Sequence, residues 1–170
     1  MVILIVGSRG SGKTTAALKI ADKFPNQLIL DLYNEHTGDL VVNGQIPKKG
    51  IKRISQEAAD PKILFEILAR LRNHFILLED STIIFSGNVS DANIKRVVIG
   101  SRHHHNTIIF IFHSLQRIPL FLFEQANYLT LFKTTETKQT FYRIGSPEIE
   151  RIYNELSKSN DPHINKTIKL

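Results

Sequence analysis

The stretch Val2-Ile3-Leu4-Ile5-Val6-Gly7-Ser8-Arg9-Gly10-Ser11-Gly12-Lys13-Thr14 decides the fold of this chain. Its first part, 2–6, is an unbroken run of β-branched residues and leucine, which is typical of a strand buried on both faces of a sheet. Its second part, 7–14, matches the pattern G-x-x-x-x-G-K-[ST] at every fixed position. Apolar residues then recur at helical spacing up to Phe24. A glycine-rich loop between a buried strand and an amphipathic helix is the setting that this pattern requires.

Each fixed residue type in the loop has a part in holding phosphate. Glycines let the backbone curl so that successive N–H groups face a phosphate, and the helix adds the positive end of its dipole. Lys13 is expected to reach the β- and γ-phosphates, and the Thr14 hydroxyl to hold Mg²⁺. The sequence therefore predicts a site for ATP or GTP with magnesium, whose binding residues are Gly7, Ser8, Arg9, Gly10, Ser11, Gly12, Lys13, Thr14 and Thr15. The alternative interpretation is a glycine turn followed by a solvated lysine.

Helices and strands alternate along the rest of the chain. The pair Asp60-Pro61 is a good helix start, and Ser146-Pro147 is another. We expect strands over 2–6, 28–31, 51–55, 75–78, 107–112, 128–132 and 140–144, and helices over 13–24, from 60 to about 74, over 91–101 and from 147. The last two strands are expected to form a closing pair around a polar turn at 135–138. The loop-rich segment 34–50 is not assigned further.

This alternation predicts an α/β protein with a mostly parallel sheet covered by helices on both faces, as in three-layer P-loop NTPases. We expect one domain over 1–157, followed by a frayed, polar and basic tail over 158–170. The chain contains no cysteine, which rules out disulfides and thiolate metal sites. No apolar run approaches the roughly 20 residues that span a bilayer. We therefore expect a soluble, cytoplasmic protein.

A pair of carboxylates follows the apolar run 75–78. A P-loop hydrolase needs an acid at the end of a neighbouring strand to support the metal, and a group beside it that positions water. Glu79 is the candidate for supporting magnesium, and Asp80 is the candidate for polarising the attacking water. The alternative is that both carboxylates are simply solvated at the end of a strand.

A second candidate region is the strand expected over 107–112, which ends in His113-Ser114. A polar group at its tip can sense a γ-phosphate, because ligands bind outside the carboxyl ends of parallel strands. His113 and Ser114 are the candidates for this contact, with His113 as the catalytic candidate, and we call this strand the sensor strand. Arg102 is a candidate arginine finger, with Arg96 and Arg117 as rivals.

Net charge and basic segments bear on the partner. The formal net charge of +6 suits a partner rich in phosphate. The basic segment 48–53 can contact a phosphate backbone or be a solvated loop. The histidines at 103–105 are interpreted as surface residues that face nucleic acid, because adjacent residues do not converge easily on one metal ion.

Several segments beyond the loop resemble a known family. Asp31, with Glu35 four positions later, resembles the segment after the second strand in the FtsK–HerA group of P-loop ATPases. Ser101-Arg102-His103, the sensor strand, the run His113-Ser114-Leu115-Gln116-Arg117-Ile118-Pro119 and the segment 127–133 together resemble the genome-packaging ATPases of double-stranded DNA viruses with an internal membrane. The resemblance extends from Val2 to about Ile144. Two positions depart from that pattern: the acidic pair is Glu79-Asp80, where the family has aspartate first, and His113 stands where the family has glutamine or asparagine.

The resemblance implies an ATPase of the additional-strand class, in which the sensor strand lies between the phosphate-loop strand and the acidic strand. It also implies a ring-shaped motor that pushes duplex DNA into a capsid. On this hypothesis the partners are double-stranded DNA and capsid or packaging-vertex proteins, and the protein is found in the host cytoplasm or with the virion. The alternatives are a nucleoside or nucleotide kinase, and a nucleotide-dependent nucleic-acid-binding switch without turnover.

Overall fold

The computed structural model describes residues 1–30, 39–40, 50–54, 61–86 and 91–170. Within these residues one sheet has eight strands in the order β3-β4-β2-β5-β6-β1-β7-β8. Its strands are β1 (Val2–Val6), β2 (Asn26–Leu30), β3 (Asp39–Leu40), β4 (Gly50–Ile54), β5 (Phe75–Leu78), β6 (Thr107–Phe112), β7 (Tyr128–Phe132) and β8 (Asn165–Lys169). Only the β7–β8 pair is antiparallel among these strands.

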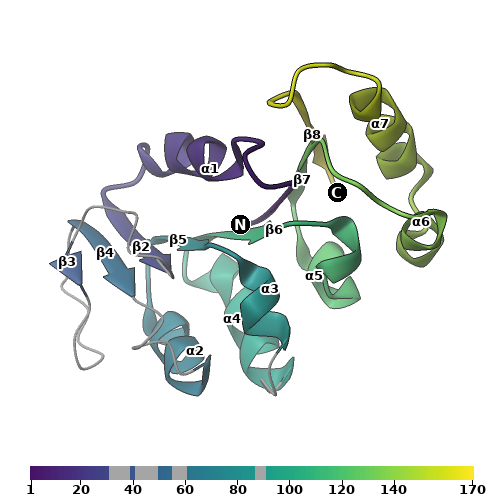
Figure 1. Ribbon diagram of the computed structural model, residues 1–170. Coiled ribbons are helices and arrows are strands. Elements are labelled where there is room, and N and C mark those ends of the chain that lie inside the picture. Colours follow the sequence, from purple (N-terminus) through teal and green to yellow (C-terminus); the bar gives the residue numbers. More distant parts are fainter. Residues whose placement is uncertain (31–38, 41–49, 55–60, 87–90) are drawn as a thin grey trace.

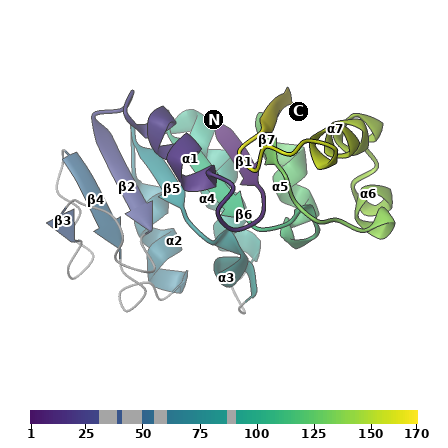
Figure 2. The same cartoon turned by 45° about the horizontal axis from the view of Figure 1, so that its top comes forward.

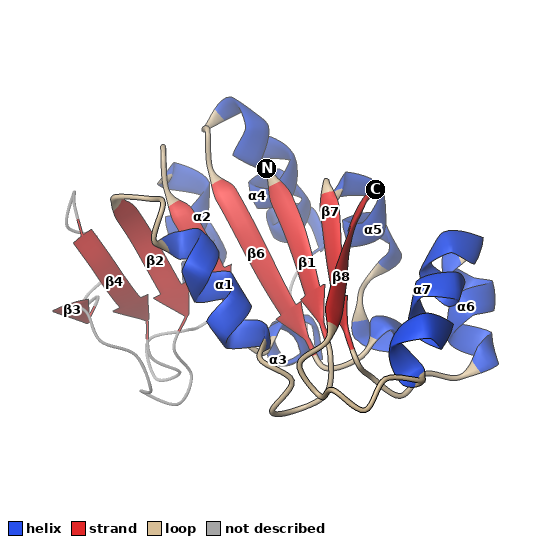
Figure 3. Ribbon diagram, turned by 90° about the horizontal axis from the view of Figure 1, so that it is seen from above, coloured by secondary structure: helices blue, strands red, loops and turns tan. Residues whose placement is uncertain are grey.

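Helices cover both faces of the sheet (Figure 1). They are α1 (Lys13–Ala21), α2 (Pro61–Arg70), α3 (Ser81–Ser86), α4 (Asp91–His103), α5 (Leu120–Gln125), α6 (Lys138–Ile144) and α7 (Pro147–Ser157), with a 3₁₀ turn over Leu115–Arg117. Helix α1 lies on one face, while α2, α3, α4 and α5 lie on the other. Helices α6 and α7 lie beyond the β8 end of the sheet (Figure 3). This arrangement confirms the predicted α/β class and the three layers.

The central strands are buried on both faces, as their apolar sequences predicted. Alternate residues of β1 enter different cores: Leu4 belongs to the larger cluster, under α2, α4 and α5, and Ile5 to the smaller one, under α1. Both side chains have no exposed surface. An unbroken apolar strand is thus the sequence signature of a strand that has a core on each side.

The strand order places β6 between β5 and β1, as the resemblance implied. Because these three strands are parallel, their carboxyl ends lie at one edge of the sheet. The phosphate loop, the acidic pair and the tip of the sensor strand are therefore brought together at that edge.

Two predictions about the C-terminal region are wrong. The segment 140–144 was expected to be a strand but belongs to α6, because the ring of Phe141 packs 4.9 Å from that of Tyr153 on α7. Gly145 ends this helix in the left-handed conformation, at φ 67°. The segment 158–170 was expected to fray, but it contains β8, which pairs with β7 and buries Ile168. Tertiary contacts outweigh the local signal in both segments.

Other elements match their expected positions or were missed. Helix α2 begins at Pro61, and Ser146 caps α7 by accepting a hydrogen bond from the backbone N–H of Ile149. The short helices α3 and α5 were not predicted, because each is too short to show a periodic pattern. No helix in the described part of the chain has both the length and the apolar character needed to cross a bilayer.

The role of β8 can be tested by truncating its buried side chain. We expect Ile168→Ala to lower the free energy of unfolding by about 2 kcal/mol, because it removes a buried side chain that packs on the larger core. Chemical denaturation measures this change. Lys169→Ala, which alters an exposed side chain of the same strand, is the matched control. Equal stability of the two variants would mean that the segment contributes no packing.

Candidate nucleotide-binding site

The phosphate loop is anchored by the ends of two neighbouring strands. The Gly7 N–H donates to the carbonyl of Phe112 at 3.2 Å, and the Ser8 N–H donates to the carbonyl of Lys133 at 3.0 Å. Gly10 and Gly12 have φ angles of 73° and 92°, a region that glycine enters at no steric cost. The loop leads directly from β1 into α1 across the front of the sheet (Figure 2). The N-terminus of α1 therefore faces the space above the strand ends.

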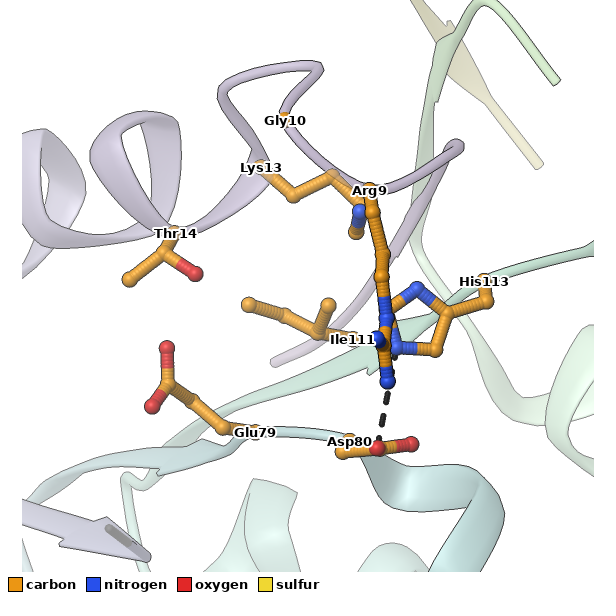
Figure 4. Close-up of a pocket in the computed structure, with 8 residues that line it drawn as sticks. All are labelled: Arg9, Gly10, Lys13, Thr14, Glu79, Asp80, Ile111 and His113. Carbon is orange, nitrogen blue, oxygen red and sulfur yellow. Dashed lines mark ion pairs between the residues drawn. The ribbon is translucent and has the colours of Figure 1, made fainter. Parts of the chain in front are cut away.

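Side chains from three elements line a cavity of about 470 Å³ in front of this loop. They come from the loop with the start of α1, from the end of β5 and from β6 with its tip (Figure 4). The lining residues are Arg9, Gly10, Lys13, Thr14, Glu79, Asp80, Ile111 and His113. Most of the predicted catalytic and binding residues are thus gathered around one cavity.

Lys13 is the buried cation of this cavity. Its side chain is only 6% exposed, and its Nζ donates to the carbonyl of Ser8 at 2.7 Å. Burial lowers the pKa of Lys13; the nearby Asp80 carboxylate opposes this shift, and Arg9 adds to it. A bound phosphate would place a negative charge beside the Lys13 ammonium, which has lost most of its contact with water.

Thr14 and Glu79 direct their oxygen atoms toward each other across the cavity (Figure 4). Mg²⁺ prefers oxygen ligands and keeps several water molecules, so it is commonly held by one or two side chains together with substrate phosphates. A hydroxyl and a carboxylate that face the same space fit this requirement. Within the described ranges there is no group of three or more His, Cys, Asp or Glu side chains that could hold a metal by itself.

Asp80 has an unusual backbone conformation and lies beside His113 at the tip of the sensor strand. Its φ of 46° lies in the left-handed region, which aspartate and asparagine adopt more readily than other non-glycine residues. Its Oδ2 lies 3.6 Å from the Nε2 of His113, and the His113 Nδ1 is buried without a partner among the described residues. The contact between the two side chains places the Asp80 carboxylate and the His113 ring next to each other at the wall of the cavity.

The three candidate arginines lie in different places. Arg117 lines a second cavity, of about 350 Å³, together with Asp80 and His113. Arg102 lies at the opposite edge of the sheet, in a hollow that it shares with Met1 at the start of β1. Arg96 lies near His104, whose pKa is lowered by burial first, then by Arg72 and His103, and least by Arg96. Of these three arginines, only Arg117 lines a cavity next to the acidic pair.

The histidine tract forms no metal site within the described residues. His104 Nδ1 accepts a hydrogen bond from Arg72 Nη1 at 2.7 Å, so the ring packs against a cation. Asp31, Glu35, Lys48 and Lys49 lie outside the described residues, while Lys52 and Arg53 lie in β4.

A third cavity, which the sequence did not reveal, lies on the other side of the loop. It has a volume of about 520 Å³ and lies between the first turns of α1 and the turn that leads into β8. The turn is held close, because Lys133 Nζ donates to the carbonyl of Ser159 at 2.8 Å. The lining residues are Ser11, Gly12, Thr15, Ala16, Lys19, Phe132, His163 and Asn165. Only the fold could bring His163 beside residues 150 positions earlier in the chain.

Comparisons with known proteins identify similar structures at low sequence identity. No protein-family model and no curated protein matches the sequence. The genome packaging NTPase B204 of Sulfolobus turreted icosahedral virus 2, in complex with AMP, superposes with a TM-score of 0.77 at 14% identity, over 99% of this chain and 92% of that chain. Its complex with ATP-gammaS gives a TM-score of 0.75 at 14% identity, over 99% and 96% of the two chains.

A related virus provides a similar match. B204, the DNA-packaging ATPase of Sulfolobus Turreted Icosahedral Virus, gives a TM-score of 0.66 at 11% identity, over 99% of this chain and 96% of that chain. The predicted resemblance to viral packaging ATPases is therefore confirmed at the level of the fold.

The close packing of the loop can be tested at Gly7. A Cβ atom there would lie 2.6 Å from Phe132 Cβ and 2.7 Å from Ser11 Oγ. We expect Gly7→Ala to lower the free energy of unfolding by about 1–3 kcal/mol, because the clash involves an atom fixed by β7. Gly100→Ala in α4 is the control, because its Cβ would meet only an ordinary contact at 3.6 Å.

Chemical denaturation should show that Gly7→Ala lowers the free energy of unfolding, whereas Gly100→Ala does not. The control should be neutral or stabilising by up to about 1 kcal/mol, since alanine favours helix. If Gly7→Ala were as stable as the wild type, the loop would not be packed against β7 as described.

Proposed function

We propose that this protein binds ATP with Mg²⁺ and hydrolyses it. One observation carries the proposal: the phosphate loop, the Glu79-Asp80 pair and His113 surround a single cavity. A phosphate held on the loop would have a cation beside it and two carboxylates opposite. This is the set of groups that phosphoryl transfer to water requires.

Each residue has a chemical task in this proposal. Lys13 exchanges its contact with Ser8 for the β- and γ-phosphate oxygens and neutralises charge there. Thr14 and Glu79 hold the magnesium ion, which when bound neutralises charge on the phosphate oxygens. Asp80 accepts a hydrogen bond from water, so that the water oxygen can attack the γ-phosphorus. As the bond between the water oxygen and phosphorus forms, the bond from phosphorus to the bridging oxygen breaks and the water gives up one proton to the Asp80 carboxylate, which later releases it to solvent. The products are ADP and inorganic phosphate.

The nucleoside would extend to the other side of the loop. The cavity beside Thr15 has the ring of Phe132 and the methyl of Ala16 as apolar surface, and His163 as a polar partner. Nucleotide sites combine apolar walls with a few polar groups in this way. We place the base in this cavity and the triphosphate across the N-terminus of α1.

We further propose that hydrolysis drives the translocation of double-stranded DNA into a capsid. The support is the fold shared along nearly the whole chain with B204, which is described as a DNA-packaging ATPase, together with the net charge of +6. In this proposal the subunits form a ring. Arg102, which is remote from the cavity of its own subunit, would act as an arginine finger only on a neighbour's nucleotide.

Two alternatives make different demands on the site. A kinase needs a place for its phosphate acceptor next to the γ-phosphate, where this chain places the acidic pair and His113. A switch without turnover needs no strained carboxylate at that position. The geometry therefore favours hydrolysis over both.

The decisive experiment measures phosphate release from ATP, with and without duplex DNA. We expect Lys13→Ala and Asp80→Asn each to lower kcat by about 100-fold or more, because Lys13 acts on the transferring phosphoryl and Asp80 on the attacking water. Asparagine is the suitable replacement for Asp80 because it tolerates the left-handed backbone while losing the charge. Lys23→Ala, an exposed lysine just after α1, is the control.

The outcomes separate the hypotheses. Release stimulated by DNA supports the motor, and release without such stimulation supports an NTPase of another kind. Phosphate transfer only in the presence of a small acceptor would establish a kinase instead. Nucleotide binding without turnover under any condition would contradict the proposed hydrolysis.

The metal role of Glu79 gives an independent prediction. We expect Glu79→Gln to raise the Mg²⁺ concentration needed for half-maximal activity by about 10-fold, because a neutral amide is a weaker partner for the ion and its water shell. A magnesium titration of phosphate release measures this, with the exposed Glu66→Gln in α2 as the control. An unchanged magnesium requirement would remove Glu79 from the metal site.

A further inference from the structure

The segment that follows the sensor strand is held from outside by side chains of a later part of the chain. After β6 ends at Phe112, the backbone passes through 113–118 without sheet neighbours among the described strands. The hydroxyl of Thr134 donates to the His113 carbonyl at 3.2 Å, and the Leu115 N–H donates to the Glu136 carboxylate at 2.6 Å. The first half of this short stretch is therefore held by residues that follow β7.

Arg143 completes the hold on the same segment. Its guanidinium donates to the carbonyls of Leu115, Gln116 and Ile118 at 2.9, 3.1 and 3.1 Å. Three carbonyls that point to one side of a turn suit the fork of donors on an arginine, which a lysine cannot match. The Glu136 carboxylate thus binds an N–H group of this segment, and the Arg143 guanidinium binds three of its carbonyl groups.

Glu136 is held in surroundings that disfavour its charge. Burial raises its pKa, while the hydrogen bond from the Leu115 backbone acts in the opposite direction. The Thr134 hydroxyl also acts in that direction, and its single proton is shared between the Glu136 carboxylate and the His113 carbonyl. Its own backbone N–H donates to the hydroxyl of Tyr153 at 3.2 Å, which links it to α7. Burying a carboxylate costs free energy, and the hydrogen bond from the Leu115 N–H offsets part of that cost.

The segment held in this way carries two groups of the proposed site. His113 lies at its start, 3.6 Å from Asp80, and Arg117 lies in its 3₁₀ turn and lines the cavity next to them. The hydrogen bonds of Glu136 and Arg143 described above reach 113–118 and not the loop 7–15. Arg143 belongs to α6, which lies beyond the β8 end of the sheet (Figure 3). Displacing the segment would therefore alter the γ-phosphate side of the site while the phosphate loop stays in place.

We propose that Glu136 and Arg143 are positioning residues for hydrolysis: together they fix the backbone of 113–118 so that His113 and Arg117 stay beside Asp80. This inference rests on the proposed ATPase function. Because both act through the sensor segment, their loss affects the chemical step and leaves nucleotide binding nearly intact. The same contacts make the pair α6–α7 the support of the γ-phosphate side of the site.

The test compares severe and conservative variants of both residues. We expect Arg143→Met and Glu136→Ala each to lower kcat by about 10-fold or more, since small misplacements of catalytic groups have effects of this size. The Kd for ATP, measured by calorimetry, should change by less than about 2-fold. Glu136→Gln keeps an oxygen acceptor for the Leu115 N–H and should retain most of the activity. Arg143→Lys should fall between the wild type and Arg143→Met, because one ammonium cannot bond all three carbonyls.

Arg151→Met is the matched control. Arg151 lies on α7 and is exposed, and it forms an ion pair with Glu155 at 3.9 Å, within the same helix. Its replacement also removes an arginine from this end of the molecule, but it should leave both kcat and Kd unchanged. Thermal unfolding of every variant identifies those that have lost folded protein.

A double-mutant comparison separates positioning from general destabilisation. In a His113→Ala background, Arg143→Met should lower kcat by a smaller factor than it does in the wild type, because one of the two groups that it positions is already gone. Full additivity of the two effects, or a loss of ATP affinity equal to the loss of kcat, would overturn the inference. If the wild type hydrolyses ATP and both severe variants match it, this inference alone fails. If the wild type binds ATP but never hydrolyses it, the proposed function fails and this inference fails with it.

Discussion

Parallel pairing of β1 with β6 on one side and β7 on the other is the constraint on which the site depends. It brings the carbonyls of Phe112 and Lys133 to the point where β1 ends, and these accept the N–H groups of Gly7 and Ser8. The loop is thereby started in a fixed direction, and its glycines complete the turn into α1. A side chain at Gly7 would occupy the space that Phe132 already fills. The phosphate site is thus a consequence of sheet geometry and of one close backbone approach.

Several groups around the cavity lower the stability of the folded protein. Lys13 is nearly buried, Asp80 has a strained backbone, and the Nδ1 of His113 lacks a partner among the described residues. None of these features stabilises the fold, and the proposed triphosphate and attacking water would account for each of them. The C-terminal part of the chain has a matching role, because Thr134, Glu136 and Arg143 hold the backbone next to His113. The site is therefore built on the sheet on one side and on α6–α7 on the other.

The sequence alone predicted a structural feature correctly wherever the residues that form the feature lie in one short segment. The loop 7–14 carries its own glycines, lysine and threonine, and the apolar runs of β1, β5 and β6 needed only their composition to be recognised. The segment 140–144 misled for the opposite reason. Its threonine and aromatic residues favour a strand, but the packing of Phe141 on Tyr153 makes it a helix.

By itself, the sequence determined the phosphate loop, the buried strands, the acidic pair after β5 and the polar tip after β6, because these are properties of neighbouring residues. Only the tertiary structure decided which of the candidate groups share a cavity. It brought His113 to Asp80, left Arg102 at the opposite edge of the sheet, paired β8 with β7, and set Glu136 and Arg143 on the backbone beyond the sensor strand. Such contacts join residues that are distant in the chain. They depend on strand order and on packing at the end of the sheet, which no local pattern records.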